Sequence, residues 1–164
     1  MARGDRPGGG TPATAFLDAR RVPYRAHGYT FDEAPGAIAR AAAERLGVDP
    51  GRLLKCLIAA LDDGRLVSVL VGGDRTLDLK ALARAAGAKK AELAPLAAAE
   101  RATGYVKGGI SPFGQRKALP LFLDRAALEH GSVLVNGGRR GLQLELAICD
   151  LLAATGAQVA DLAR

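Results

Sequence analysis

Two glycine-rich segments beside basic residues are the part of this sequence best suited to chemistry. The first glycine loop, residues 108–114 (GGISPFG), follows Lys107, and the second glycine loop spans residues 136–141 (NGGRRG). Paired glycines let the backbone pass close to a ligand and let N–H groups converge on one concavity. We therefore expect a shared site for an anionic or carbonyl-bearing ligand, with two tight turns between strands as the plain alternative.

A lysine inside an apolar strand is the second candidate. Lys55 stands between Leu54 and Cys56 in the run LLKCLIAAL, residues 53–61. Lysine is seldom fully buried without a partner, so either its stem packs while its ammonium reaches water, or the cation holds a phosphate or carbonyl oxygen. Strand alternation puts Cys56 on the opposite face of the sheet from Lys55, so adjacency alone does not make them a catalytic pair.

Several familiar kinds of site are missing from the sequence. The first glycine loop has neither the Gly-Lys-Ser/Thr ending of a phosphate loop nor a Gly-x-Gly-x-x-Gly fingerprint. Ser111 is followed by proline, which suits a turn better than a nucleophile elbow. His27 and His130 lack metal-ligand spacing, and Cys56 and Cys149 lie far apart in apolar runs. We expect no metal and no cofactor, and catalysis, where present, by positioning and electrostatics.

The composition is that of an ordinary globular protein with a basic balance. The chain has 164 residues, of which 49% are hydrophobic and 24% charged, and its formal net charge is +6. The charge favours anionic partners such as nucleic acid, although no basic block reaches the length of a DNA-coating tail. Residues 1–10 read as a flexible arm without the apolar core of a signal peptide, and no stretch is long enough for a membrane span. We expect a cytoplasmic protein.

The elements that must position these residues alternate between helices and strands. Periodicity and breaker residues predict helices over residues 11–19, 32–46, 78–86, 95–102 and 145–154. They predict strands over 22–29, 53–61, 66–71, 91–93, 121–123, 133–135 and 142–144, with a hairpin turn at Asp62-Asp63-Gly64. This mixture indicates an α/β or α+β fold with a mixed sheet, in a single domain over residues 11–164.

Short segments in a fixed order extend over nearly all of the chain after residue 10. They are 11–13 (TPA), 27–29 (HGY), 54–57 (LKCL), 77–80 (LDLK), 87–90 (GAKK), 103–115 (TGYVKGGISPFGQ), 137–142 (GGRRGL) and 160–163 (ADLA). In order and spacing they resemble the YbaK-type aminoacyl-tRNA deacylases, which are similar to the editing domain inserted in bacterial prolyl-tRNA synthetases. The first glycine loop with an upstream strand lysine is the specific part. Within the family, the chain most resembles the bacterial Cys-tRNA(Pro) deacylases.

The resemblance implies a fold, a reaction and partners. The fold is a curved mixed sheet, partly closed like a barrel, with helices around it. The reaction cleaves the ester between a wrongly attached amino acid, cysteine above all, and the 3′-terminal adenosine of tRNA(Pro). The partners are aminoacylated tRNA and prolyl-tRNA synthetase in a transient complex. The oligomeric state is left open.

The resemblance also implies roles for individual residues. The family's key lysine falls on Lys55 and its pocket glycine on Gly108, so the expected catalytic residues are Lys55, Gly108 and Gly109. The expected substrate-binding residues are Tyr29, Cys56, Ile110, Ser111, Asn136, Gly137, Gly138, Arg139 and Gln143. A backbone N–H aimed at the developing oxyanion is often worth about 10²–10³ in rate. In the cysteine case the thiol of the substrate supplies the nucleophile and leaves a cyclic thiolactone.

Two departures from the family pattern keep other functions open. Gln143 stands where some members close to the cysteine enzyme carry an acid, and Cys56 stands where threonine is frequent. The changes remove a charge and a hydroxyl, so they bear on the accepted amino acid more than on deacylation. The alternatives are a non-catalytic module that binds tRNA ends or nucleotides, a water-using deacylase for alanine or another small amino acid, and a different hydrolase on the same fold.

Overall fold

The structure is a computed structural model and describes residues 10–29 and 38–164. The helices are α1 (Pro12–Ala19), α2 (Ile38–Leu46), α3 (Leu79–Ala85), α4 (Leu96–Thr103), α5 (Ile148–Thr155) and the 3-10 helix η1 (Arg125–Glu129). The strands are β1 (Arg25–Gly28), β2 (Leu53–Leu61), β3 (Leu66–Gly72), β4 (Ala91–Leu93), β5 (Leu121–Asp124), β6 (Ser132–Asn136), β7 (Leu142–Ala147) and β8 (Gln158–Ala160).

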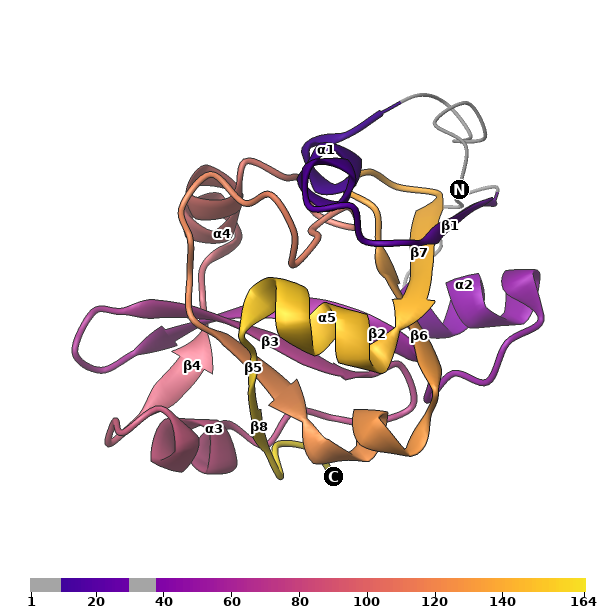
Figure 1. The fold of residues 1–164 in the computed structure, drawn as a ribbon. Coiled ribbons are helices and arrows are strands. Elements are labelled where there is room, and N and C mark those ends of the chain that lie inside the picture. The colour runs from indigo at the N-terminus through magenta and orange to yellow at the C-terminus, as the bar shows by residue number, and fades with distance from the viewer. Residues whose placement is uncertain (1–9, 30–37) are drawn as a thin grey trace.

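The eight strands of the described residues form one mixed sheet, surrounded by helices as expected (Figure 1). The order along the sheet is β1-β7-β6-β2-β3-β5-β8, and β4 pairs with β2 outside this path. Strand β2 is central: it runs antiparallel to β3 and parallel to β6. The order places β2, β6 and β7 side by side, so residues from three distant parts of the sequence meet on one sheet.

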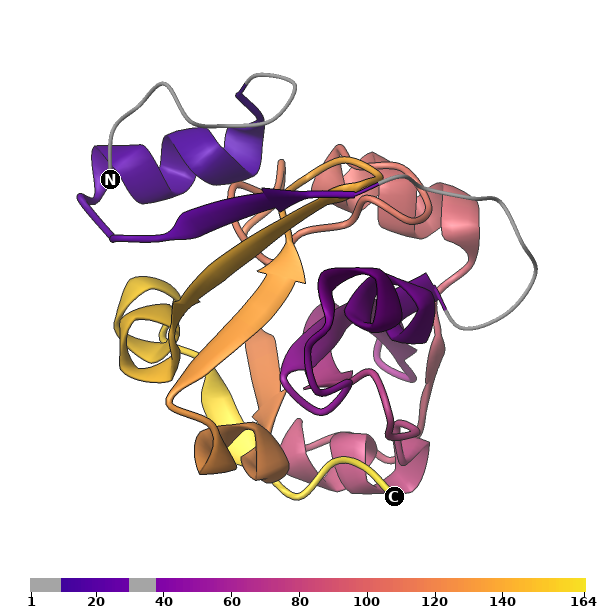
Figure 2. The same ribbon diagram turned by 90° about the vertical axis from the view of Figure 1, so that its right-hand side faces the viewer.

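The two faces of the sheet have different coverings. The inner face carries Leu54, Leu70, Val133, Val135 and Leu144 and packs against α1, α5 and the first glycine loop through Leu17, Leu151 and Phe113. The outer face packs against α2 around Leu53 and Leu134, and against α3 and the C-terminal segment around Val69 and Leu162. Figure 2 shows α5 and α2 on opposite sides of β6 and β7.

Most predicted elements are present, but several boundaries differ. The predicted strand 22–29 is shorter as β1, because the Val22 N–H closes the end of α1 on the Leu17 carbonyl at 3.0 Å and Pro23 has no N–H to donate. The predicted helix 145–154 is wrong at its start. Strand β7 continues to Ala147, which pairs with Ser132, and sheet pairing overrides the local helical pattern.

Two elements were not predicted from the sequence. They are η1 and β8, and β8 forms a parallel pair with β5 that joins Leu123 and Val159. The arm predicted for residues 1–10 lies almost wholly outside the described residues, as do the first six residues of the helix predicted at 32–46. None of the helices described here is long and apolar enough to cross a membrane.

Candidate functional site

The two glycine loops lie in direct contact. Asn136, at the end of β6, joins them: its side-chain nitrogen donates to the Gly108 carbonyl at 3.0 Å, and its side-chain oxygen accepts the Gly138 N–H at 2.7 Å. A Cβ atom on Gly109 would lie 2.8 Å from the Cα atom of Arg139. Glycine at this position therefore allows the backbones of the two loops to touch.

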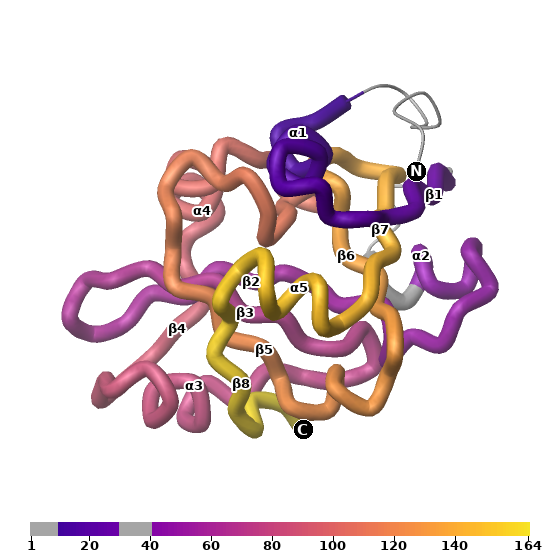
Figure 3. Tube along the Cα trace, in the orientation of Figure 1, coloured from indigo at the N-terminus to yellow at the C-terminus, as the bar shows by residue number. Residues whose placement is uncertain are grey.

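The start of α1 holds both loops in place. Thr11 caps α1, with its hydroxyl oxygen accepting the Thr14 N–H at 3.2 Å, and the same hydroxyl donates to the Gly137 carbonyl. In the first loop, a Cβ atom on Gly114 would clash with the Pro12 carbonyl. Figure 3 shows the segment between α4 and β5 running beside α1. The helix thus fixes the two loops relative to each other.

The N–H groups of the first glycine loop are not equivalent. The Gly109 N–H donates to the Val106 carbonyl at 2.9 Å and is used within its own turn. Gly108 has a φ of 83°, a left-handed conformation that favours glycine, and its N–H forms no hydrogen bond with any described residue. Of the two donors expected for an oxyanion, Gly108 is the one that its turn does not occupy.

Lys55 lies on the outer face of the sheet. Its neighbours Leu54 and Cys56 pack into the inner-face core, as strand alternation predicts. The ammonium is partly buried and donates to the Arg75 carbonyl at 2.6 Å. The pairing of Leu54 with Val135 in parallel β2 and β6 brings Lys55 level with Asn136, the residue that holds the Gly108 carbonyl.

Arg75, whose carbonyl accepts the Lys55 hydrogen bond, is positioned by contacts of its own side chain. The Arg75 side chain donates to the Ala163 carbonyl at 3.2 Å and lies 3.7 Å from the carboxylate of Asp124. Asp124 is almost fully buried, and its other oxygen accepts the Leu162 N–H at 2.9 Å. The C-terminal segment therefore helps to position the turn that carries the Lys55 acceptor.

Gln143 and Tyr29 lie on the same outer face. Asn136 pairs with Gln143 across β6 and β7, so their side chains share that face. Gln143 is 3% exposed, and its amide nitrogen donates to the Tyr29 hydroxyl at a long 3.4 Å. Its amide oxygen is buried and has no hydrogen-bond partner among the described residues. A buried acceptor without a hydrogen bond costs about 1–3 kcal/mol of stability. A ligand that donates a hydrogen bond to this oxygen would remove that cost.

Arg139 presents a second set of buried polar atoms. Its Nε and Nη2 atoms are buried and have no hydrogen-bond partner within the parts of the chain that the structure describes. Its backbone lies against Gly109. A guanidinium in this state is suited to an anionic or carbonyl oxygen at the contact between the loops. In residues 10–29 and 38–164, no group of three His, Cys, Asp or Glu side chains could hold a metal ion.

Three predicted site residues lie apart from this outer-face group. Cys56 and Ile110 pack against the inner-face core. Burial raises the pKa of the Cys56 thiol to about 12, so the thiol is neutral near pH 7. Ser111 is fully buried, with its hydroxyl oxygen accepting the Phe113 N–H at 3.2 Å. The burial of Ile110 and Ser111 fixes the first glycine loop against the inner-face core.

A charged network beside the site was missed from the sequence. Glu145 contacts His27 and Arg52, each at 2.9 Å, and accepts the Ser132 hydroxyl at 3.2 Å. Partial burial raises the pKa of Glu145, but hydrogen bonds from His27, Arg52 and Ser132 outweigh it and lower the pKa overall. The serine contacts the carboxylate and not the imidazole, so this is not a hydrolytic triad. One feature of the sequence does point to the network. His27 lies two residues before Tyr29 and Glu145 two residues after Gln143, so strand alternation places His27 and Glu145 on the same face as Tyr29 and Gln143.

Comparisons with known proteins agree over nearly the whole chain. The family model for the aminoacyl-tRNA editing domain matches residues 33–154. EbsC of Enterococcus faecalis, described as a candidate Cys-tRNA(Pro)/Cys-tRNA(Cys) deacylase, is 36% identical over 152 residues, which cover 93% of this chain and 92% of that protein.

Two solved structures have a similar fold. One is a candidate trans-editing enzyme for prolyl-tRNA synthetase, with a TM-score of 0.81 and 29% identity over 93% of this chain and 95% of the other. The second is a hypothetical protein, with a TM-score of 0.82 and 30% identity over 94% of this chain and 100% of the other.

Proposed function

Because the chain belongs to the aminoacyl-tRNA editing domain family, we propose that it is a trans-editing deacylase that removes cysteine from wrongly charged tRNA(Pro). The observation that carries the proposal is the position of Asn136. Its side chain holds the Gly108 carbonyl, and the sheet register brings it level with Lys55. A loop with a donor, a cation and a buried amide acceptor on one face is suited to an ester at the end of a polyanion.

The reaction is proposed to use the substrate's own nucleophile. The cysteine sulfur attacks its ester carbonyl carbon, and the carbonyl oxygen takes up the negative charge while it accepts the Gly108 N–H. The bond from this carbon to the ribose oxygen then breaks. The ribose oxygen ends as a hydroxyl with the proton that the thiol gave up, and the amino acid leaves as a thiolactone. Lys55 orients the ester or the terminal phosphate from the outer face.

The proposed partner is aminoacylated tRNA, engaged in the cytoplasm where it is made. The net charge of +6 supports a polyanionic partner. A transient complex with prolyl-tRNA synthetase is proposed from the description of the solved relative with 29% identity. It would explain how one short-lived substrate is reached before it enters translation.

A second candidate function has one specific observation in its favour. Gln143 is a buried neutral amide where an acid occurs in some members, and its amide oxygen has no hydrogen-bond partner among the described residues. This amide oxygen can accept a hydrogen bond from a positioned water, which replaces the substrate thiol in a water-using deacylase for alanine. The two candidates differ in which aminoacyl ester is cleaved.

Incubation with a panel of charged tRNAs tests the proposal, with Lys55→Ala as the variant. We expect cysteine release from tRNA(Pro) by the native protein and its loss in Lys55→Ala with the fold retained, because the change removes a partly buried cation and not a core side chain. Circular dichroism and thermal unfolding check the fold. Native-like activity of the variant would remove Lys55 from the site, and binding of tRNA without release of any amino acid would favour a non-catalytic module.

A further inference from the structure

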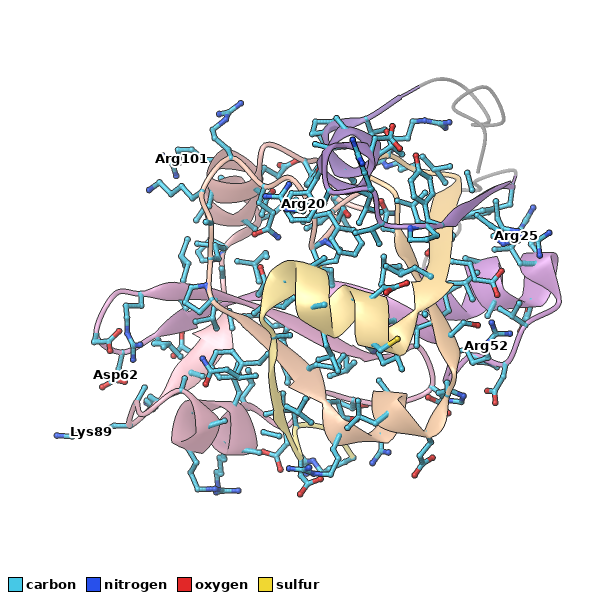
Figure 4. All side chains as sticks on the ribbon, viewed as in Figure 1. Arg20, Arg25, Arg52, Asp62, Lys89 and Arg101 are labelled. Atoms are coloured by element: carbon cyan, nitrogen blue, oxygen red, sulfur yellow. The ribbon has the colours of Figure 1, made fainter. Side chains whose placement is uncertain are left out.

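A cluster of exposed cations lies beside the two glycine loops. Its members, called the basic cluster here, come from α4, from the segments on both sides of the first glycine loop, and from the second glycine loop: Arg101, Lys107, Arg116, Lys117 and Arg140. All five are exposed. Figure 4 shows Arg101 projecting from α4 at the top of the molecule.

Backbone contacts fold these cations onto one part of the surface. The Arg116 N–H donates to the Thr103 carbonyl at 2.9 Å, and the Lys117 N–H donates to the Ala102 carbonyl at 2.9 Å, so both follow the end of α4. Arg140 donates to the Lys107 carbonyl at 2.8 Å, which ties the second glycine loop to the residue before the first. Lys107 and Arg140 therefore border the contact between the loops, and Arg116 and Lys117 lie beside the end of α4.

Several arginines elsewhere in the protein are paired with acids, whereas four members of the basic cluster form no ion pair with a described residue. Arg52, Arg65, Arg125 and Arg164 each lie within 4.0 Å of a carboxylate. By contrast, no ion pair with a described residue involves Arg101, Lys107, Arg116 or Lys117. The one acid in the segment that carries these four, Glu100, accepts the Lys107 backbone N–H at 3.3 Å.

We propose that the basic cluster binds the phosphate backbone of the tRNA acceptor stem while the 3′ end occupies the site at the glycine loops. This inference rests on the proposed function for the identity of the polyanion. An ester held at Gly108 is joined through a short single strand to a helix whose phosphates are closely spaced, and that helix must leave the site past neighbouring surface. Arg101, Lys107, Arg116 and Lys117 can contact phosphates and release their counterions without losing an existing ion pair to a described residue. Three of the five are arginines, which match phosphate oxygens in a bidentate way.

The chain offers a matched control for this proposal. Arg116 and Lys117 are adjacent exposed cations in the basic cluster. Lys89 and Lys90 are likewise adjacent and exposed, and Lys89 projects at the lower end of the molecule, away from Arg101 (Figure 4). The double variants Arg116→Gln/Lys117→Gln and Lys89→Gln/Lys90→Gln each remove two positive charges, so a difference between them reports position and not net charge.

The experiment compares two substrates and one binding reaction. Deacylation is measured on cysteinyl-tRNA(Pro) and on cysteinyl-adenosine, which has the same ester but no phosphates. Binding of uncharged tRNA(Pro) is measured by fluorescence anisotropy over a range of salt concentrations. For the Arg116/Lys117 variant we expect tRNA affinity to fall by about 10- to 60-fold at 0.1 M salt and the salt slope to fall by about 1 to 2. Cleavage of cysteinyl-adenosine should be unchanged, and the Lys89/Lys90 variant should match the native protein.

Any of three other outcomes would contradict binding of the acceptor stem by the basic cluster. Equal loss of tRNA affinity in both double variants means that only net charge matters. Unchanged tRNA affinity in the Arg116/Lys117 variant places the acceptor stem elsewhere, and an equal loss on cysteinyl-adenosine means that the change acts on the site itself. If the native protein cleaves neither ester, the proposed function fails, and the binding arm still decides whether the basic cluster holds tRNA.

Discussion

Replacing Gly109 with alanine is expected to push the two glycine loops apart and to slow deacylation. The new Cβ atom would lie 2.8, 3.0 and 3.1 Å from three backbone atoms of Arg139 and Arg140. Ordinary van der Waals contact begins at 3.4 Å, so the loops must separate by about 0.6 Å. Backbone atoms cannot rotate away as a side chain does. Overpacking of this kind costs about 1–3 kcal/mol, and a misplacement near 1 Å can cost about 10²-fold in rate.

Gly131→Ala is the matched control. Gly131 has no positive φ and no heavy atom within 4 Å of the added Cβ, so alanine there should leave activity unchanged and stability equal or slightly higher. The measurements are single-turnover deacylation of cysteinyl-tRNA(Pro) and the free energy of unfolding in urea. We expect a rate about 10- to 100-fold below native for Gly109→Ala. A native rate in Gly109→Ala with its expected loss of stability would refute the argument that contact between the loops sets the geometry of the ester.

Three further outcomes are expected. Gly108→Ala should lower turnover more than tRNA affinity, because the φ of 83° at Gly108 strains alanine at the proposed oxyanion donor. Single-turnover rates and tRNA binding measure the two effects separately, and a loss of affinity alone would place Gly108 on a binding surface. On the same tRNA, the cysteine ester should be cleaved far faster than the serine ester, because an alcohol is a weaker nucleophile than a thiol. A site that discriminates by size alone would separate the two esters by only about 10–200-fold. Rapid release of alanine with the cysteine ester left intact would reject thiol assistance. At pH 8 iodoacetamide should modify exposed Cys149 and spare Cys56, whose pKa is raised by burial to about 12, and mass spectrometry measures the modification. The stability that the neutral Cys56 thiol contributes should be lost as pH rises from about 9 toward 12, which urea unfolding measures. Equal modification of the two cysteines would contradict the burial of Cys56.

Local patterns in the sequence predict the central elements of the fold well. The apolar run 53–61 and the turn at Asp62-Asp63-Gly64 predict β2 and the hairpin to β3 because turn chemistry and strand pattern agree there. The predicted helix at 145–154 fails at its start because pairing with β6 keeps Glu145 to Ala147 extended. Pairing of this kind depends on tertiary contacts that periodicity does not contain.

The candidate site divides in the same way. Two glycine loops and a lysine in an apolar strand point to a site from local chemistry alone. Alternation correctly separates Lys55 from Cys56, since Leu54 and Cys56 pack into the inner-face core. The contact of Arg75 with Lys55 and the network around Glu145 join residues from distant segments, so local spacing can place His27 and Glu145 on one face but cannot predict these contacts. His27 lacks metal-ligand spacing, but its place two residues before Tyr29 puts it on the same outer face as Gln143.

The register of β2 decides which side chain faces the site. Lys55 pairs with Val71 and Cys56 with Leu70, in a ladder that runs back to the hairpin turn at Asp62-Asp63-Gly64. A slip of one residue would turn Cys56 toward Asn136 and bury the Lys55 ammonium against α1 and α5, where burial of a charge is costly. The apolar side chains at alternate positions of β2 would lose their core contacts in the same slip. The packing that stabilises the hairpin therefore also selects Lys55 as the outer-face residue level with Asn136, and a turn far from the site contributes to its geometry.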